Sequence, residues 1–166
     1  MKYFALYHSS IQVLLLLATS FASAQSYNKT VEQKRLNANK AKWNASLRSS
    51  GCGYVMTLSR GCFCMLEDLG PFHVVVNSSG EIAMATYLEA MDEELSGTEV
   101  PDPQAVDVLT VQGVFDEIQE ALDDEIDGLE VTYDATNGVP TKVSMDSSTE
   151  YVDDEMTLSI ENVILL

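Results

Sequence analysis

Three cysteines, Cys52, Cys62 and Cys64, are the first candidates for reactive residues in the chain. Thiols of exported proteins usually oxidise, so an odd number predicts one disulfide and one remaining thiol. A direct bridge between Cys62 and Cys64 spans a single strand residue, near the outer limit of disulfide geometry. Pairing of Cys52 with either of them requires the strand to fold back, so the sequence leaves the pairing open. A thiol enzyme using Cys62 or Cys64 is one functional alternative, although no local pattern around His73 indicates an ordered triad.

Carboxylates offer a second chemistry, because segment 123–134 partly matches the calcium-binding loop of an EF-hand. The candidate ligands are Asp123, Glu125, Asp127 and Asp134. Gly128 stands at the sixth position, but Glu130 takes a position that is normally apolar, and a strand rather than a helix follows. An acidic helix end is the plain alternative. A second acidic cluster comprises Asp146, Asp153, Asp154 and Glu155, which would meet if the last two strands pair.

The distribution of charge limits the partners of the chain. Its formal net charge is −17, and from Gly61 onward 25 acidic residues face one basic residue, Lys142. Such a field repels nucleic acid and attracts cations or basic protein surfaces. No phosphate-binding glycine loop, nucleophile elbow or metalloprotease helix is present, and the scarcity of histidine argues against zinc. A non-catalytic binding or structural role is therefore favoured over an enzyme, and calcium is the one cofactor that the pattern suggests.

Residues 1–24 have the features of a secretory signal peptide. Lys2 precedes a short apolar run, and Ala22-Ser23-Ala24 matches the small-residue cleavage rule. The run is too short for a comfortable membrane span. We therefore expect a secreted, extracellular protein with no membrane span after removal of the signal. Three sequons are candidate glycosylation sites: Asn28, Asn44 and Asn77.

Hydrophobic periodicity predicts the elements that must position these residues. Residues 25–50 form an N-terminal helix, and its apolar stripe is Val31, Leu36, Trp43 and Leu47. The remaining chain, 51–166, forms one α+β domain. Its predicted strands are 53–64, 72–76, 81–88, 129–134, 141–146 and 156–161, and a second helix follows Thr110. The acidic connection 89–109 separates the halves, and its composition favours mobility.

The last three strands share one apolar face, which helices must cover. That face comprises Leu129, Val131, Tyr133, Val143, Met145, Met156, Leu158 and Ile160. The predicted fold is a two-layer α+β domain, with an antiparallel sheet of about five or six strands and two helices in the order αβββαβββ.

The order of features resembles an uncharacterised domain-of-unknown-function family of small exported proteins and lipoproteins. The resemblance extends from about Trp43 to Ile160, through Cys62-Phe-Cys64, Tyr133-Asp134, Gly138-x-Pro140 and Asp153-Asp-Glu155. The long acidic insert and the additional Cys52 depart from the pattern. The resemblance supports the fold and implies no established activity.

Overall fold

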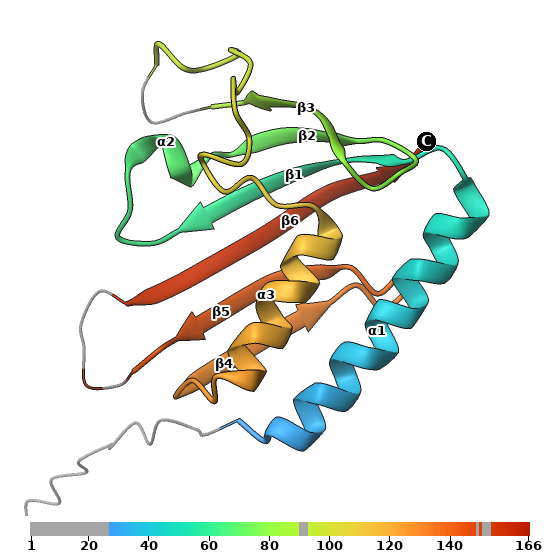
Figure 1. The fold of residues 1–166 in the computed structure, drawn as a ribbon, viewed down its shortest axis with the longest axis vertical. Coiled ribbons are helices and arrows are strands. Elements are labelled where there is room, and N and C mark those ends of the chain that lie inside the picture. The colour runs from blue at the N-terminus through green and yellow to red at the C-terminus, as the bar shows by residue number, and fades with distance from the viewer. Residues whose placement is uncertain (1–26, 90–92, 149, 151–153) are drawn as a thin grey trace, which may run out of the picture.

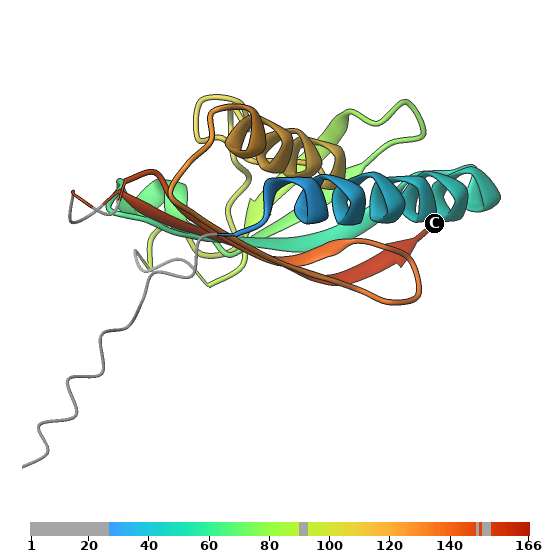
Figure 2. The same cartoon turned by 90° about the horizontal axis from the view of Figure 1, so that it is seen from below.

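The computed structural model describes residues 27–89, 93–148, 150 and 154–166. One six-stranded antiparallel sheet, in the order β3-β2-β1-β6-β5-β4, carries two long helices on the same face (Figures 1 and 2). The helices are α1 (Lys29–Ser50), α2 (Leu66–Leu69) and α3 (Val111–Asp123). The strands are β1 (Tyr54–Gly61), β2 (Phe72–Val76), β3 (Ile82–Tyr87), β4 (Gly128–Tyr133), β5 (Pro140–Asp146) and β6 (Glu155–Leu165). The architecture is thus the expected two-layer α+β arrangement.

Helix α3 follows directly from its sequence. The Oγ1 atom of Thr110 caps it by accepting a hydrogen bond from the N–H of Gly113 at 3.0 Å. Its apolar residues recur at helical spacing, and all of them are buried against the sheet: Val111, Val114, Phe115, Ile118, Ala121 and Leu122. The helix was predicted from this stripe, and the prediction is confirmed.

Helix α1 has a weaker apolar stripe and relies more on polar contacts. Leu36 and Trp43 are buried, whereas Val31 is 48% exposed, so its predicted place in the stripe is wrong. The Arg35 guanidinium donates to the carbonyl oxygen of Val131 on β4 at 2.9 Å. Two ion pairs, Lys29–Glu125 and Lys40–Asp116, join basic α1 to the acidic α3 region. Because most of the basic residues lie on α1, this helix partly neutralises the acidic layer beside it.

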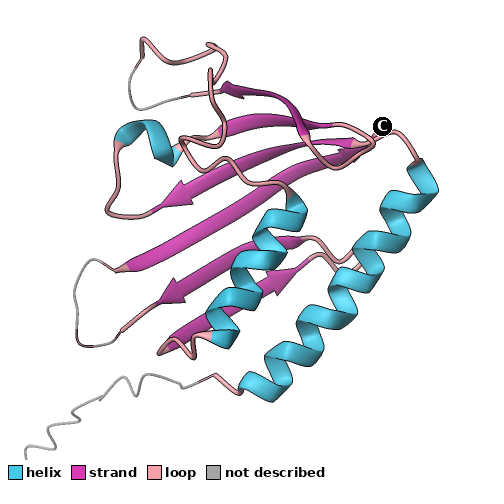
Figure 3. Ribbon diagram, in the orientation of Figure 1, coloured by secondary structure: helices cyan, strands magenta, loops and turns pink. Residues whose placement is uncertain are grey.

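The C-terminal strand β6 lies in the middle of the sheet, between β1 and β5. Strand β6 pairs with β5 along Lys142–Asp146 and with β1 along most of its length. This places the two strand triplets side by side in one sheet, as Figure 3 shows. Tyr54 at the start of β1 joins the layers: its ring packs edge-on against Trp43, and its hydroxyl accepts from the N–H of Val111 at 3.0 Å.

The predicted apolar face of the last three strands lies beneath the helices. Six of its eight residues are buried, while Tyr133 and Met156 are half-buried and pack against the core. Alternate positions face away from the helices and are largely polar or charged, and several bear hydroxyl groups: Thr57, Ser59, Thr86, Ser144, Thr157 and Ser159. The period of two therefore separates a dry face from a wet face, as expected.

Two features differ from the sequence prediction. A third helix, the four-residue α2, lies between β1 and β2, so the predicted two helices and the order αβββαβββ are incomplete. The acidic connection is anchored where a mobile segment was expected: Val100 and Val108 are buried, and the N–H of Val100 donates to the carbonyl of Ala85 at 2.8 Å. Apolar residues embedded in an acidic run fix it to β3. Among the described residues, no helix has the length and apolar character to cross a membrane.

Candidate functional site

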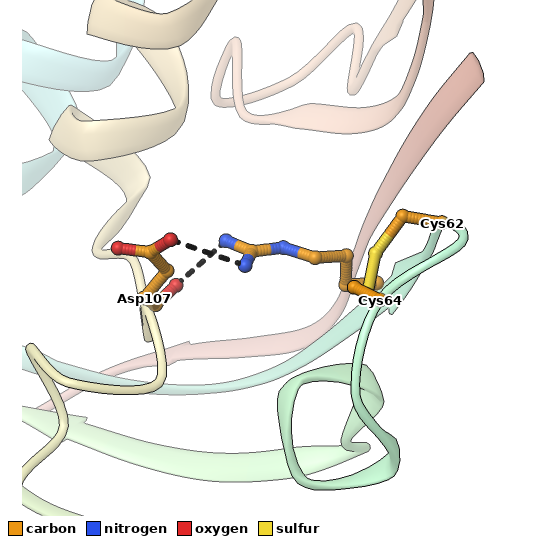
Figure 4. The surroundings of a disulfide bond; sticks show 4 residues. Cys62, Cys64 and Asp107 are labelled. Carbon is orange, nitrogen blue, oxygen red and sulfur yellow. Dashed lines mark hydrogen bonds and ion pairs between the residues drawn. A yellow bond between two sulfur atoms is a disulfide. The ribbon is translucent and has the colours of Figure 1, made fainter. Parts of the chain in front are cut away.

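The connection between β1 and β2 is the most unusual surface feature of the described chain. Antiparallel neighbours are most often joined by loops of about two to five residues, whereas ten residues separate Gly61 from Phe72. The additional length begins with Cys62, Phe63, Cys64, Met65 and Leu66, here named the Cys62–Leu66 tip. A disulfide bond joins Cys62 to Cys64, whose Cα atoms are 5.3 Å apart (Figure 4).

Large apolar side chains of this tip are exposed to solvent. Phe63 is 86% exposed, Met65 68% and Leu66 53%. Exposed hydrophobic residues are common singly, but here three of them lie within four positions of the chain. Side chains this exposed contribute little to the stability of the isolated domain, so they suit contact with another molecule.

The base of the tip is fixed to the body of the domain. The Arg60 guanidinium donates to the carbonyl oxygen of Asp107 at 2.8 Å and lies 3.6 Å from its carboxylate (Figure 4). The Arg60 side chain is only 10% exposed, so this contact is held within the structure. On the other side, Gly70 has φ +75, and a Cβ atom there would meet the Phe72 ring at 2.8 Å. Both ends of the connection are therefore constrained, and its apolar tip projects between them.

Acidic groups surround the apolar tip. Glu67 and Asp68 follow it directly in the sequence. Burial raises the pKa of Tyr87 on β3, and the charges of Glu67 and Asp68 raise it further. A surface hollow of about 330 Å³ beside the tip is lined by Gly61, Cys62, Phe63, Glu155 and Thr157. The site thus combines an apolar projection with a negative rim.

The structure decides the cysteine pairing that the sequence left open. Strand β1 ends at Gly61, so Cys62 and Cys64 lie in a turn and not in the extended strand that was predicted through Cys64. Their Cα separation falls within the ordinary disulfide range, because the chain bends there. Cys52 is a free, exposed thiol before the opposite end of β1. His73 lies opposite Thr57 and Thr86 in the sheet, so the register does not place it beside the disulfide.

The four candidate ligands of segment 123–134 are not brought together. Glu125 forms an ion pair with Lys29 at 2.9 Å. Asp134 lies beyond the far end of β4 from the other three, where its Oδ1 accepts from the N–H groups of Thr136 and Asn137. These hydrogen bonds lower the pKa of Asp134 and fix the turn into β5. The acidic helix end and the turn are separate structural features.

The second acidic cluster is partly assembled. Asp146 and Glu155 are cross-strand partners on β5 and β6, as expected if the last strands pair. They line a surface hollow of about 430 Å³ together with Glu130 of β4. The Oδ1 atom of Asp146 and that of Asp154 are each buried without a hydrogen-bond partner. Asp153 lies outside the described residues, and within the described ranges no three acidic, histidine or cysteine side chains are placed to hold a metal ion.

The candidate glycosylation sites differ in their local roles. Asn28 caps α1, with its Oδ1 accepting from the N–H of Val31 at 3.1 Å. Asn44 lies within α1, half-buried beside Trp43. Asn77 organises the turn between β2 and β3, where its Oδ1 accepts from the N–H groups of Ser79 and Glu81. Glycan attachment at any of them stays a prediction.

The sequence prediction missed the three exposed residues Phe63, Met65 and Leu66. The available signal was the interruption of strand alternation at Gly61, followed by large apolar residues in a segment that leads into Glu67 and Asp68.

Together these features define a two-layer α+β domain with a helix-covered antiparallel sheet and a disulfide-closed tip. The chain belongs to the family described as "Family of unknown function (DUF6174)", whose model matches residues 35–165. That range begins within α1 and includes all six strands. The expected membership of a domain-of-unknown-function family is confirmed. No curated protein and no solved structure matches the chain.

Proposed function

We propose that this chain is a non-catalytic binding module of the cell exterior, and that the Cys62–Leu66 tip is its contact surface. The exposure of Phe63 within the disulfide-closed loop, and of Met65 and Leu66 directly after it, carries the proposal. Apolar anchors inserted into a partner's pocket supply most of the binding energy in many protein interfaces. The loop is held at its base by Arg60, so little conformational entropy is lost when it docks.

Charge complementarity indicates the chemistry of the partner. Glu67, Asp68 and Glu155 lie around the tip in a chain of net charge −17. A matching surface is a protein with an apolar pocket rimmed by Lys or Arg side chains. Basic rims accelerate association and make it sensitive to salt. Export rests on the signal-like residues 1–24, and N-terminal sequencing of the secreted protein should find Gln25 as its first residue.

Site-specific crosslinking tests the proposed surface. A photoreactive benzoylphenylalanine at position 63 should crosslink one defined protein in cells that express the chain. The matched control is the same residue at Val31, which is 48% exposed on α1 and should give no such product. The purified partner should then bind the wild-type chain, and Phe63→Ala should weaken binding about tenfold or more. Equal crosslinking from both positions, or an unchanged affinity, would refute the tip as the contact surface.

A calcium-responsive role is the second candidate, favoured by the buried and unpartnered oxygens of Asp146 and Asp154. A cation bound at either carboxylate would satisfy an oxygen that has no hydrogen-bond partner. Thermal unfolding with calcium, against EDTA and a magnesium control, tests it, since a ligand at about 100 times its dissociation constant stabilises the fold by about 2.7 kcal/mol. Asp146→Asn should abolish a calcium-selective rise in Tm. No such rise in the wild-type chain would remove this candidate.

A further inference from the structure

The Cys62–Cys64 disulfide differs from a structural cross-link in where it lies. It joins residues two positions apart, so it closes a very short loop and removes little freedom from the unfolded chain. Cys64 is exposed and Cys62 half-buried, while every core residue lies elsewhere. Exposed disulfides are the more easily reduced and exchangeable ones.

We propose that Cys62 and Cys64 form a redox-active pair that exchanges disulfides with the thiols of other proteins. Three observations carry the assignment: the one-residue spacing, the exposure of Cys64, and the apolar surface of Phe63 and Met65 on either side of it. The apolar neighbours suit contact with unfolded or loosely folded chains, which expose both hydrophobic segments and cysteines. This exchange is a redox activity additional to docking, for which alone the non-catalytic role is proposed, and it does not depend on the proposed partner.

The exchange proceeds through a mixed disulfide between the protein and the substrate. A substrate thiolate attacks Sγ of the accessible Cys64, the bond between the two sulfur atoms breaks, and Cys62 leaves as a thiolate. The second substrate thiolate then attacks the substrate sulfur that is bonded to Cys64 in the mixed disulfide, and Cys64 leaves as a thiolate. The substrate dithiol loses two electrons and two protons, and Cys62 and Cys64 gain them. A small disulfide of the glutathione type reoxidises the pair and is itself reduced to two thiols.

A reduced synthetic peptide with two cysteines, together with glutathione buffers, tests the exchange. The protein is the mature chain carrying Cys52→Ser, which removes the exposed free thiol and leaves the pair intact. One equivalent of oxidised protein should convert about one equivalent of peptide to its disulfide, and alkylation with mass spectrometry should find two new thiols at positions 62 and 64. Circular dichroism should remain that of the folded domain throughout.

Single-cysteine variants compare how readily the two sulfur atoms react with a small disulfide. In the Cys52→Ser background, Cys62→Ser leaves Cys64 as the single thiol, and Cys64→Ser leaves Cys62. Glutathione disulfide should form a mixed disulfide with Cys64 several-fold faster than with Cys62, because Cys64 is the more exposed. A pair that stays oxidised in millimolar glutathione, or that is reduced only when the protein unfolds, would overturn the proposal. That result would leave the docking surface, tested by crosslinking at position 63, unaffected.

Discussion

Phe115 and Phe63 are residues of the same type in opposite environments. Phe115 on α3 is fully buried between the helix and the sheet, whereas Phe63 in the Cys62–Leu66 tip is 86% exposed. Both are flanked by large apolar residues: Val114 and Ile118 near the first, Met65 and Leu66 near the second. Apolar residues in the body thus lie where the fold buries them, and those in the tip lie where the described chain leaves most of their surface exposed.

The contrast shows how stability and function are separated in this domain. Burial of a large aromatic side chain stabilises a fold by several kcal/mol. Exposure of the same side chain adds no stability and increases the risk of aggregation. The interior therefore explains how the domain folds, and the tip is the region whose composition stability does not explain. The following substitutions measure each side of this comparison, in order of expected effect.

Replacement of the buried aromatic residue should have the largest effect. Phe115→Ala removes a fully buried ring and leaves a cavity beside Tyr133. The two rings are stacked, and their centroids are 6.5 Å apart. We expect a loss of about 3–5 kcal/mol in the free energy of unfolding. Urea denaturation with an unchanged m-value would measure it. A loss below about 1 kcal/mol would mean that α3 is not packed as described.

A polar feature of the body should have a smaller effect. Asp134→Ala removes the acceptor of two backbone N–H groups in the turn before β5, at 2.7 and 3.1 Å. We expect a loss of about 1 kcal/mol at neutral pH. The folded-state pKa of Asp134 is lowered, first by the N–H of Asn137 and then by that of Thr136. Its contribution is therefore present above the unfolded pKa of 3.8 and is lost as pH falls through the folded pKa. Unfolding of both proteins at neutral and acidic pH should show the difference shrinking with acid; a constant difference would contradict the charge-dependent role.

The acidic face of α3 should give a pH effect of the opposite sign. Burial, followed by the charge of Glu120, raises the pKa of Glu117 above 4.5, although Arg60 opposes this shift. Between its unfolded and folded pKa values the native state holds more protons, so its contribution to stability decreases as pH rises through that window. Glu117→Gln should match the wild type below about pH 4 and be relatively more stable near neutrality. Glu161→Gln on the exposed face of β6 is the control, and the two variants should not respond alike.

Replacement of the exposed aromatic residue should leave stability nearly unchanged. Phe63→Ala is expected to alter the free energy of unfolding by no more than about 0.5 kcal/mol, since the ring contacts mainly solvent. The same urea titration used for Phe115→Ala measures it. A loss above about 1 kcal/mol would show that the ring packs on the domain, and the contrast between the two phenylalanines would fail.

Much of the body was predictable from local pattern. The stripe of α3, the alternation in β4 to β6 and the Thr110 cap each depend on residues within a few positions of one another. Local sequence determines these features because side-chain direction repeats every 3.6 residues in a helix and every two in a strand. The weak stripe of α1 was predicted less well, because Arg35 and the ion pairs to α3 compensate for its exposed Val31.

The site depended on contacts that local pattern does not encode. Tertiary structure brought β6 between β1 and β5, placed Asp134 far from Asp123, and put Cys52 before the opposite end of β1 from Cys62. Each is a matter of which distant segments meet, and sequence periodicity carries no information on distant partners. By itself, the sequence determined the acidic charge, the elements and their apolar faces. The tertiary structure decided that Phe63, an apolar residue like any in the core, has no face of the domain to pack against. It remains exposed in the short loop that Cys62 and Cys64 close.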